Sequence, residues 1–418
     1  MTQQPSSPKS GASPSASPAA PRTAASPTVV ASSLGASPSA APAAPPAAAS
    51  PLLIATSSGA SPSAPPIAPL IAASPLLAAA SPGTIIPAVP AELVQPFEPL
   101  SDDDADSTLE EDAASSTASI ASSILHYRTV NGRTYHSDRV GSEGYWAPND
   151  DEANNFLEII YHALTLAMNG KLYYAPLPDN IQKVLDIGTG TGIWAIDFAD
   201  AHPEATVIGT DLSPIQPGWV PPNLFFEIEN FEEWSFSEQS VDYIHLRYLV
   251  GGVRDWTKLF KDAYKTLKPG GWVESYDFDG SAFSDDNTVT NEMALSKWGD
   301  IFQQGCDKLG IGASFSPIAD KLIRRGMEAA GFVNIVEVPI KIPISEWAAD
   351  PAMREIGLYT RAAFEGDMNG AVNMPATQLG WSKEEITVYC ARMRKEMRNL
   401  KIHAYFMTQV MYGQRPLA

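Results

Sequence analysis

Residues 184–194 read VLDIGTGTGIW, and this stretch decides the fold of the chain. Its apolar first half predicts a buried strand over residues 183–187, and the glycines that follow predict a tight loop before a helix. Gly188, Gly190 and Gly192 let the backbone turn sharply and approach a ligand without an intervening Cβ. The amides at the start of the next helix favour an anionic or carboxylate-bearing ligand. A cofactor loop is therefore expected here.

The glycine spacing separates several kinds of cofactor loop. The third glycine of a dinucleotide GxGxxG motif falls on Ile193 in this chain, so the spacing is GxGxG, and no Gly-Lys-Ser/Thr of a Walker loop follows. Asp186 stands two residues before the first glycine, where a carboxylate approaches a bound ammonium group. A phosphate has no use for that carboxylate, so the loop indicates an aminoacyl group.

Two further elements lie downstream of the loop. Asp211, in VIGTDLSP, ends the next predicted strand 19 residues beyond Gly192, where α/β nucleotide sites place an acid that accepts both ribose hydroxyls. KPGGW, residues 268–272, predicts a tight turn between a helix and a strand. Each element alone is compatible with a helix cap or an ordinary turn. Their combination at these spacings indicates a nucleotide-cofactor site.

The flanking sequence alternates between strand and helix patterns, which predicts an α/β fold with a parallel sheet and right-handed crossovers. The expected strands are residues 183–187, 206–210, 224–228, 241–246, 272–276, 332–338 and 403–412. The expected helices are residues 152–168, 192–201, 256–267, 316–330, 351–365 and 383–400.

The N-terminal part differs in composition. Of 36 prolines, 21 lie in the first hundred residues, and a GASPS motif returns every 24 residues at Gly11, Gly35 and Gly59. A solenoid is rejected, because proline removes backbone donors and alanine and serine bury little area. We expect a disordered repeat tail over residues 1–97 and an acidic linker over 98–125, with contact to a basic partner as the alternative to a solvated linker. Residues 126–418 form the folded domain.

Composition excludes several classes of protein. The chain has 28 basic and 48 acidic residues in 418, a net charge of −20, which argues against direct nucleic-acid binding. Its two cysteines form no CxxC pair and its six histidines no HExxH motif, so no metal site is expected. No apolar run reaches the ~18 residues of a membrane span, and the start lacks a secretory signal. The expected location is cytoplasmic or nuclear.

Several motifs resemble those of a known family. VLDIGTGTGIW, GTDLSP and KLFKDAYKTLKPGGWVE resemble class I S-adenosylmethionine-dependent methyltransferases. Four others resemble the fungal LaeA-like methyltransferases in particular, over residues 127–418: GRTYH (132–136), APNDDEANN (147–155), DYIHLRYL (242–249) and KIHAYFMTQVMYGQRP (401–416). The resemblance implies a Rossmann-like, mostly parallel sheet with flanking helices and a helical cap, and S-adenosyl-L-methionine as the cofactor.

The resemblance also implies roles for residues. The loop of Gly188, Thr189, Gly190 and Gly192 would wrap the methionine part of the cofactor, with Asp186 near its amino group. Asp211 would hold the ribose hydroxyls and Leu212 would lie against the adenine. Glu229 and Asn230 stand where the family usually has two aspartates that face the adenine amino group. Tyr135 and Arg247 would border the site, unless they are a packed aromatic and a helix-cap arginine.

The sequence leaves the catalytic residues and the methyl acceptor open. Transfer from a sulfonium is an in-line displacement that needs mainly proximity and a desolvated cleft. His162, His245 and His403 are candidate bases, but each is more typical of a structural histidine, so none is assigned. The helix near 152–168 and the insertion near 346–398 are expected to set specificity.

Three functions share these motifs. The first is methylation of a small-molecule metabolite of fungal secondary metabolism, and the second is a nuclear regulator of metabolite genes acting in a protein complex, on a protein acceptor. The third, a non-catalytic scaffold, is disfavoured by the intact glycine loop and Asp211.

Overall fold

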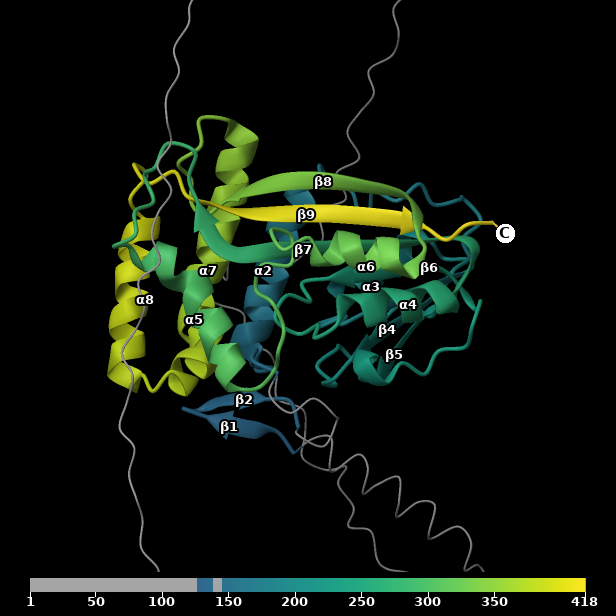
Figure 1. The fold of residues 1–418 in the computed structure, drawn as a ribbon, viewed down its shortest axis with the longest axis horizontal. Coiled ribbons are helices and arrows are strands. Elements are labelled where there is room, and N and C mark those ends of the chain that lie inside the picture. Colours follow the sequence, from purple (N-terminus) through teal and green to yellow (C-terminus); the bar gives the residue numbers. More distant parts are fainter. Residues whose placement is uncertain (1–125, 138–144, 418) are drawn as a thin grey trace, which may run out of the picture. The chain divides into compact units, whose positions relative to one another are not determined.

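The computed structural model describes residues 126–137 and 145–417 of the chain. Within them, seven strands form one sheet (Figure 1). The strand order is β5-β4-β3-β6-β7-β9-β8. The first five pair in parallel, and β9 lies antiparallel between β7 and β8. The strands are β3 (Lys183–Ile187), β4 (Thr206–Asp211), β5 (Leu224–Ile228), β6 (Val241–Arg247), β7 (Leu267–Phe283), β8 (Val333–Pro343) and β9 (Tyr405–Gln414). The predicted α/β fold is confirmed; the predicted tail and acidic linker lie outside the described residues.

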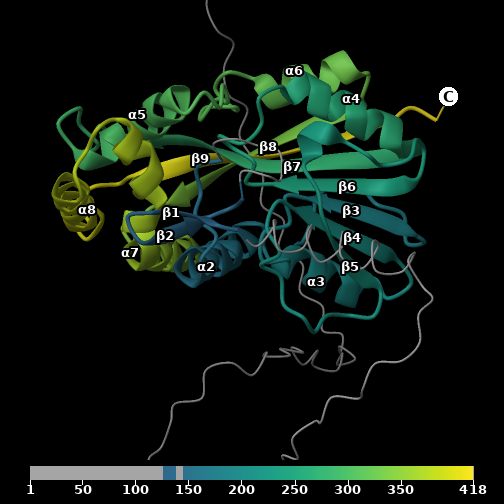
Figure 2. The same cartoon turned by 90° about the horizontal axis from the view of Figure 1, so that it is seen from below.

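Helices cover both faces of this sheet, as the apolar strands require. On β3, Leu185 and Ile187 pack in the cluster that includes α4 (Trp256–Thr266) and α6 (Leu322–Ala330). Val184, on the opposite face, packs with the residues of α3 (Ile193–Ala201). Figure 2 shows α4 and α6 on one side of the sheet and α3 on the other. The alternation along β3 therefore distributes its side chains between two apolar layers.

A second group of helices lies beside the extended end of β7 (Figures 1 and 2). It comprises α2 (Asp151–Ala167), α5 (Ala294–Lys308), α7 (Pro351–Gln378) and α8 (Lys383–Met397). Their buried faces share one large apolar cluster that includes Trp298, Phe302 and Phe364. Among the described ranges, no helix is both long and apolar enough to cross a membrane.

Several predicted boundaries were wrong. The helix expected over 316–330 begins only at Leu322, because Lys321 has a left-handed φ of 55° and the amides of Ile318 and Ala319 bond the Asp279 carboxylate. The strand expected over 272–276 extends over Leu267–Phe283, since its far half pairs with β9. Helix α7 continues beyond residue 365 to Gln378 across a non-helical residue.

Three of the strands and α-helices were not predicted at all. Helix α5 has an apolar face, but no helix was predicted there. Strands β1 (Arg128–Val130) and β2 (Arg133–Tyr135) form a small hairpin, with Asn131 and Gly132 at positive φ in its turn. Strands of three residues carry too little pattern to stand out in a sequence.

Buried carboxylates along β7 fix the neighbouring loops. Glu274 accepts bonds from the amides of Tyr174 and Ala175, and burial raises its pKa to about 7 although these bonds oppose the shift. Asp277 accepts bonds from the amides of Leu249 and Val250 at 3.0 and 3.3 Å. These bonds satisfy carboxylates that burial would otherwise penalise. They also fix the loop after β6, which borders the site described below.

Candidate functional site

A cavity of about 220 Å³ opens where the parallel strands end. Parallel α/β sheets bind ligands at this edge because the loops that follow the strands converge there. Nine predicted site residues line the cavity: Asp186, Gly188, Thr189, Gly190, Asp211, Leu212, Glu229, Asn230 and Arg247. The other two, Gly192 and Tyr135, are not among its lining residues.

The glycine loop connects β3 to α3 with three residues in left-handed backbone. Gly188, Gly190 and Gly192 have φ of 67°, 60° and 81°. A Cβ on Gly188 would lie 2.5 Å from a methyl of Leu249. A Cβ on Gly192, the N-cap of α3, would overlap the ring of Phe226. Gly188 and Gly190 therefore shape the cavity wall, whereas Gly192 allows the helix to pack on β5.

Asp186 is held in place by two side chains. Its carboxylate accepts a bond from Thr189 Oγ1 at 2.6 Å and lies 2.7 Å from His245 Nδ1. The His245 ring stacks on Trp194 with centroids 3.6 Å apart, and burial lowers the pKa of the imidazole while Asp186 opposes that shift. His245 therefore orients Asp186, and it is not among the cavity-lining residues. The carboxylate keeps spare lone pairs toward the cavity.

The other two candidate histidines lie outside the cavity lining. His162 is exposed and packs edge-on against Tyr359 with ring centroids 4.4 Å apart. His403 Nδ1 lies 2.5 Å from Asp286. No role as catalytic base follows for either.

Asp211 joins the end of β4 to the glycine loop. Its carboxylate accepts bonds from the amides of Gly190 at 2.8 Å and Ser213 at 3.1 Å. Burial raises its pKa to about 6, and these backbone bonds oppose the shift. Each oxygen retains a lone pair, which suits the hydroxyl donors of a ribose.

Glu229 and Asn230 follow β5 and are already engaged. The Glu229 carboxylate accepts bonds from the amide and the hydroxyl of Ser235. The Asn230 side-chain carbonyl accepts a bond from the Glu232 amide at 3.0 Å and caps the 3-10 helix η2 (Phe231–Glu233). Both residues line the cavity. Their contact with an adenine remains a prediction.

Arg247 and Tyr135 have different surroundings. Arg247 ends β6, lines the cavity and lies over the ring of Tyr161, 4.5 Å from its centroid. Burial lowers the pKa of its guanidinium. Tyr135, on β2, is fully buried, and its hydroxyl accepts a bond from Asn373 Nδ2 at 2.8 Å. Tyr135 thus packs the hairpin against α7.

Asn149 was missed by sequence reasoning. It lines the cavity, and its Nδ2 donates to Ser213 Oγ at 3.1 Å. Its Oδ1 is buried without a hydrogen-bond partner in the described part of the chain. A single asparagine in the polar run APNDDEANN gave no signal of its own. The unpaired carbonyl next to Asp211 fits a ligand rich in N–H and O–H donors, as a nucleoside is.

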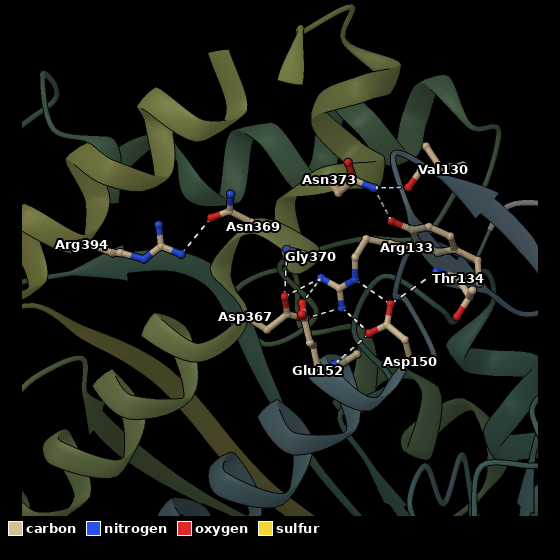
Figure 3. Close-up of polar contacts among 12 residues, drawn as sticks. Val130, Arg133, Thr134, Asp150, Glu152, Asp367, Asn369, Gly370, Asn373 and Arg394 are labelled. Carbon is tan, nitrogen blue, oxygen red and sulfur yellow. Dashed lines mark hydrogen bonds and ion pairs between the residues drawn. The ribbon is translucent and has the colours of Figure 1, made fainter. Parts of the chain in front are cut away.

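An ionic cluster around Arg133 fixes the hairpin to the site (Figure 3). The guanidinium on β2 donates to Asp150, the N-cap of α2, at 2.6 Å and to Asp367 at 2.5 and 2.8 Å. Asp367 has non-helical φ and ψ of −134° and 41°, and its carboxylate also accepts the amide of Gly370. Asp367 and Phe364, one turn earlier on α7, line the cavity. The cluster therefore positions one wall of the site.

Replacing Gly370 by alanine is expected to disrupt this cluster, because the new Cβ would overlap the Arg133 guanidinium. Overpacking of this kind costs about 1–2 kcal/mol of folding stability. Gly366→Ala is the matched control, since that Cβ meets nothing within 4 Å on the same helix and is expected to stabilise. Urea unfolding of both variants measures the difference. Equal stabilisation by both would contradict the importance of the cluster.

Comparison with known proteins gives consistent results. A family model described as "Methyltransferase domain" matches residues 160–337. The chain is 36% identical over 307 residues to methyltransferase pytC of Aspergillus terreus, covering 73% of this chain and 93% of that protein. It is 35% identical over 295 residues to secondary metabolism regulator LAE1 of Cochliobolus heterostrophus, covering 68% and 94%.

A third relative and one solved structure complete the comparison. The chain is 33% identical over 297 residues to protein-methionine methyltransferase laeA of Emericella nidulans, covering 70% of this chain and 77% of that protein. Among solved structures, phosphoethanolamine N-methyltransferase 2 of Haemonchus contortus in complex with S-adenosyl-L-methionine aligns with a TM-score of 0.40 and 17% identity, covering 64% and 57%.

Proposed function

The chain belongs to the LaeA-like family of S-adenosylmethionine-dependent methyltransferases, and from this membership we propose that it methylates a small-molecule metabolite of secondary metabolism. The observation that carries the proposal is one cavity whose lining includes both the glycine loop with Asp211 and residues of α2, α5 and α7. A concave, largely apolar chamber of this kind suits a small acceptor.

The proposed cofactor site uses the strand ends. Gly188, Thr189 and Gly190 surround the methionine part, and Gly192 sets the direction of α3. Asp186 faces the amino group of the cofactor with a carboxylate that His245 and Thr189 hold in position.

The nucleoside part of the proposed site lies at the ends of β4, β5 and β6. Asp211 accepts the ribose hydroxyls, and Leu212 packs against the adenine. Glu229 and Asn230 border the adenine, and Arg247 lines the cavity with its guanidinium over the Tyr161 ring. Tyr135 contributes indirectly: its hydroxyl accepts a hydrogen bond from Asn373, which holds the hairpin against α7.

When bound, S-adenosylmethionine would supply a methyl group on a sulfonium sulfur: a lone pair of the acceptor would bond to the methyl carbon as the S–CH3 bond breaks, and the electrons of that bond would stay on the departing sulfur. The residues of this chain contribute orientation and exclusion of water. In this proposal, the loop and Asp211 fix one reactant, and the chamber beside α2, α5 and α7 holds the other away from water.

Titration with S-adenosylmethionine by calorimetry, followed by metabolite profiling of a deletion strain, tests the proposal. We expect one cofactor per chain, and in the deletion strain the loss of one methylated compound with accumulation of its unmethylated precursor. A deletion that changes transcripts of many metabolite genes, with no such precursor, would instead indicate the regulatory function in a protein complex. The regulatory function would use the same cofactor-site residues as the metabolite methyltransferase.

Residues 126–418 are proposed to be the complete cofactor-binding domain, with the repeat tail (1–97) and acidic linker (98–125) dispensable for it. A chain that begins at Ser123 is therefore expected to fold and to bind the cofactor with unchanged affinity. A chain that begins at Ser137 is the control, because it lacks the hairpin and the Arg133 cluster. We expect that shorter chain to unfold at lower temperature. An insoluble chain from Ser123 would contradict the boundary.

A further inference from the structure

The half of the cavity beside α5 and α7 is walled by aromatic rings. Trp146 follows the hairpin, Phe156 comes from α2, Trp298 and Phe302 from α5, and Phe364 from α7; all five line the cavity. Segments more than 200 residues apart in the chain thus contribute to one surface. The glycine loop and Asp211, at the ends of β3 and β4, line the same cavity.

These rings contact one another and form a continuous wall. Trp146 meets Phe302 edge to face with centroids 5.0 Å apart, and Phe302 lies 4.8 Å from Trp298. Phe364 continues the wall, 5.4 Å from Trp298 and 5.3 Å from Phe156. Trp298, Phe302 and Phe364 are buried, with at most 5% of their surfaces exposed. Rings that hold one another in this way give a preformed surface.

In the described structure, the elements that carry these rings contribute one charged residue to the cavity lining, Asp367. The charged residues that line the cavity are Asp186, Asp211, Glu229, Glu232, Arg247 and Asp367. All but Asp367 lie at or shortly after the carboxyl ends of the parallel strands, where the cofactor is proposed to lie. Asp367 is ion-paired with Arg133, which also pairs with Asp150 and Glu152, and it accepts the Gly370 amide. A charged acceptor would lose its hydration here without gaining a partner.

An aromatic wall alone would also suit a cation, because ring faces attract positive charge. Here Asp367, the carboxylate that α7 contributes to the cavity lining, already bonds Arg133 and the Gly370 amide, so a cation at the wall would have to compete with Arg133 for it. A flat, neutral molecule loses little hydration and gains contact with several rings. The wall therefore discriminates by charge as well as by shape.

We infer that this aromatic wall, formed by Trp146, Phe156, Trp298, Phe302 and Phe364, is the acceptor site, and that it takes an uncharged, planar, largely apolar acceptor such as a conjugated or aromatic ring system. The inference rests on the proposed function and specifies its substrate class. The inference assigns to the wall only the binding of the acceptor. The acceptor's nucleophilic atom then faces the glycine loop.

Three probes of similar size test the inference on the full chain loaded with S-adenosylhomocysteine. They are neutral 2-naphthol, anionic 2-naphthoate and cationic trimethylanilinium, each titrated by calorimetry. We expect 2-naphthol to bind at one site per chain and each charged probe to bind at least about tenfold more weakly. Tighter binding of either charged probe would overturn the inference.

Two variants locate the binding. Phe302→Leu keeps an apolar side chain but removes a ring from the wall, and it is expected to weaken 2-naphthol binding by about tenfold. Phe156→Asp adds a charge at a half-buried position, so we expect 2-naphthol to bind more weakly and trimethylanilinium more tightly. Trp219→Ala is the control, because Trp219 is 92% exposed and lies outside the cavity lining.

S-Adenosylhomocysteine affinity separates the two hypotheses. If the wild-type chain does not bind it, the proposed function fails. If the wild-type chain binds it and 2-naphthol does not bind, or binds equally to wild type and to both wall variants, only the acceptor inference fails. If Phe302→Leu does not fold, the charge inversion at Phe156 decides the inference by itself.

Discussion

Replacing Gly190 by valine is expected to abolish S-adenosylmethionine binding while the fold persists. Gly190 has a φ of 60°, where a residue with a Cβ is strained by roughly 1–2 kcal/mol. Its amide also donates to Asp211, so a distorted loop moves the ribose acceptor as well. A branched side chain would in addition fill space at the cavity wall near Leu157. Calorimetry measures the affinity, and circular dichroism checks the fold.

Gly170→Val is the matched control for backbone strain. Gly170 has a φ of 75°, and a Cβ there meets nothing within 4 Å. It follows α2 and does not line the cavity. We expect a similar loss of stability with unchanged cofactor affinity. If both valine variants bound the cofactor as the wild type does, the glycine loop would not be the cofactor site.

Replacing Asp211 by alanine is expected to weaken cofactor binding by about 1–3 kcal/mol, roughly fivefold to 150-fold. The variant loses the acceptor proposed for the ribose hydroxyls, and it leaves the amides of Gly190 and Ser213 without their carboxylate partner. The loss should therefore appear for S-adenosylhomocysteine too, since both ligands carry the same ribose. Calorimetry with each ligand measures it.

Asp242→Ala provides the corresponding control. Its carboxylate also accepts two backbone amides, those of Gln182 and Lys183, at 3.1 and 2.9 Å. It lies at the opposite ends of the strands, near the starts of β3 and β6. We expect a comparable loss of stability without loss of affinity. An equal loss of cofactor affinity in both variants would mean that Asp211 acts through stability alone.

Cofactor affinity is expected to fall as the pH falls through about 6. Burial raises the pKa of Asp211 to about 6, above its ordinary value, so the carboxylate becomes protonated below that pH. A protonated carboxyl offers fewer acceptor positions to the ribose hydroxyls. Titrations between pH 5 and 8 measure the effect, and Asp211→Ala should show a flatter profile. The same slope in that variant would assign the titration to another group.

The parallel sheet and the glycine loop could be predicted because they are local in the sequence. Apolar strands such as 183–187, followed by a glycine loop and a helix, specify a βα unit within about twenty residues. The position of Asp211 follows from the next such unit. Nine of the predicted site residues consequently line one cavity.

The distinction between neighbouring glycines was not visible in the sequence. Gly190 lines the cavity, whereas Gly192 faces the ring of Phe226 on β5. The motif requires glycine at both positions, but for different reasons. The difference depends on which strand lies beside the loop, and that is set by sheet order.

The sequence by itself determined the fold class, the glycine loop and the position of Asp211, because each depends on spacing within a short segment. Only the tertiary structure decided the aromatic wall and the Arg133 cluster. Arg133 meets Asp367 across 234 residues, and Trp146 meets Phe302 from a different element. Contacts of such separation leave no periodic pattern in the chain, since they arise only when packed helices and a hairpin close over the ends of the strands.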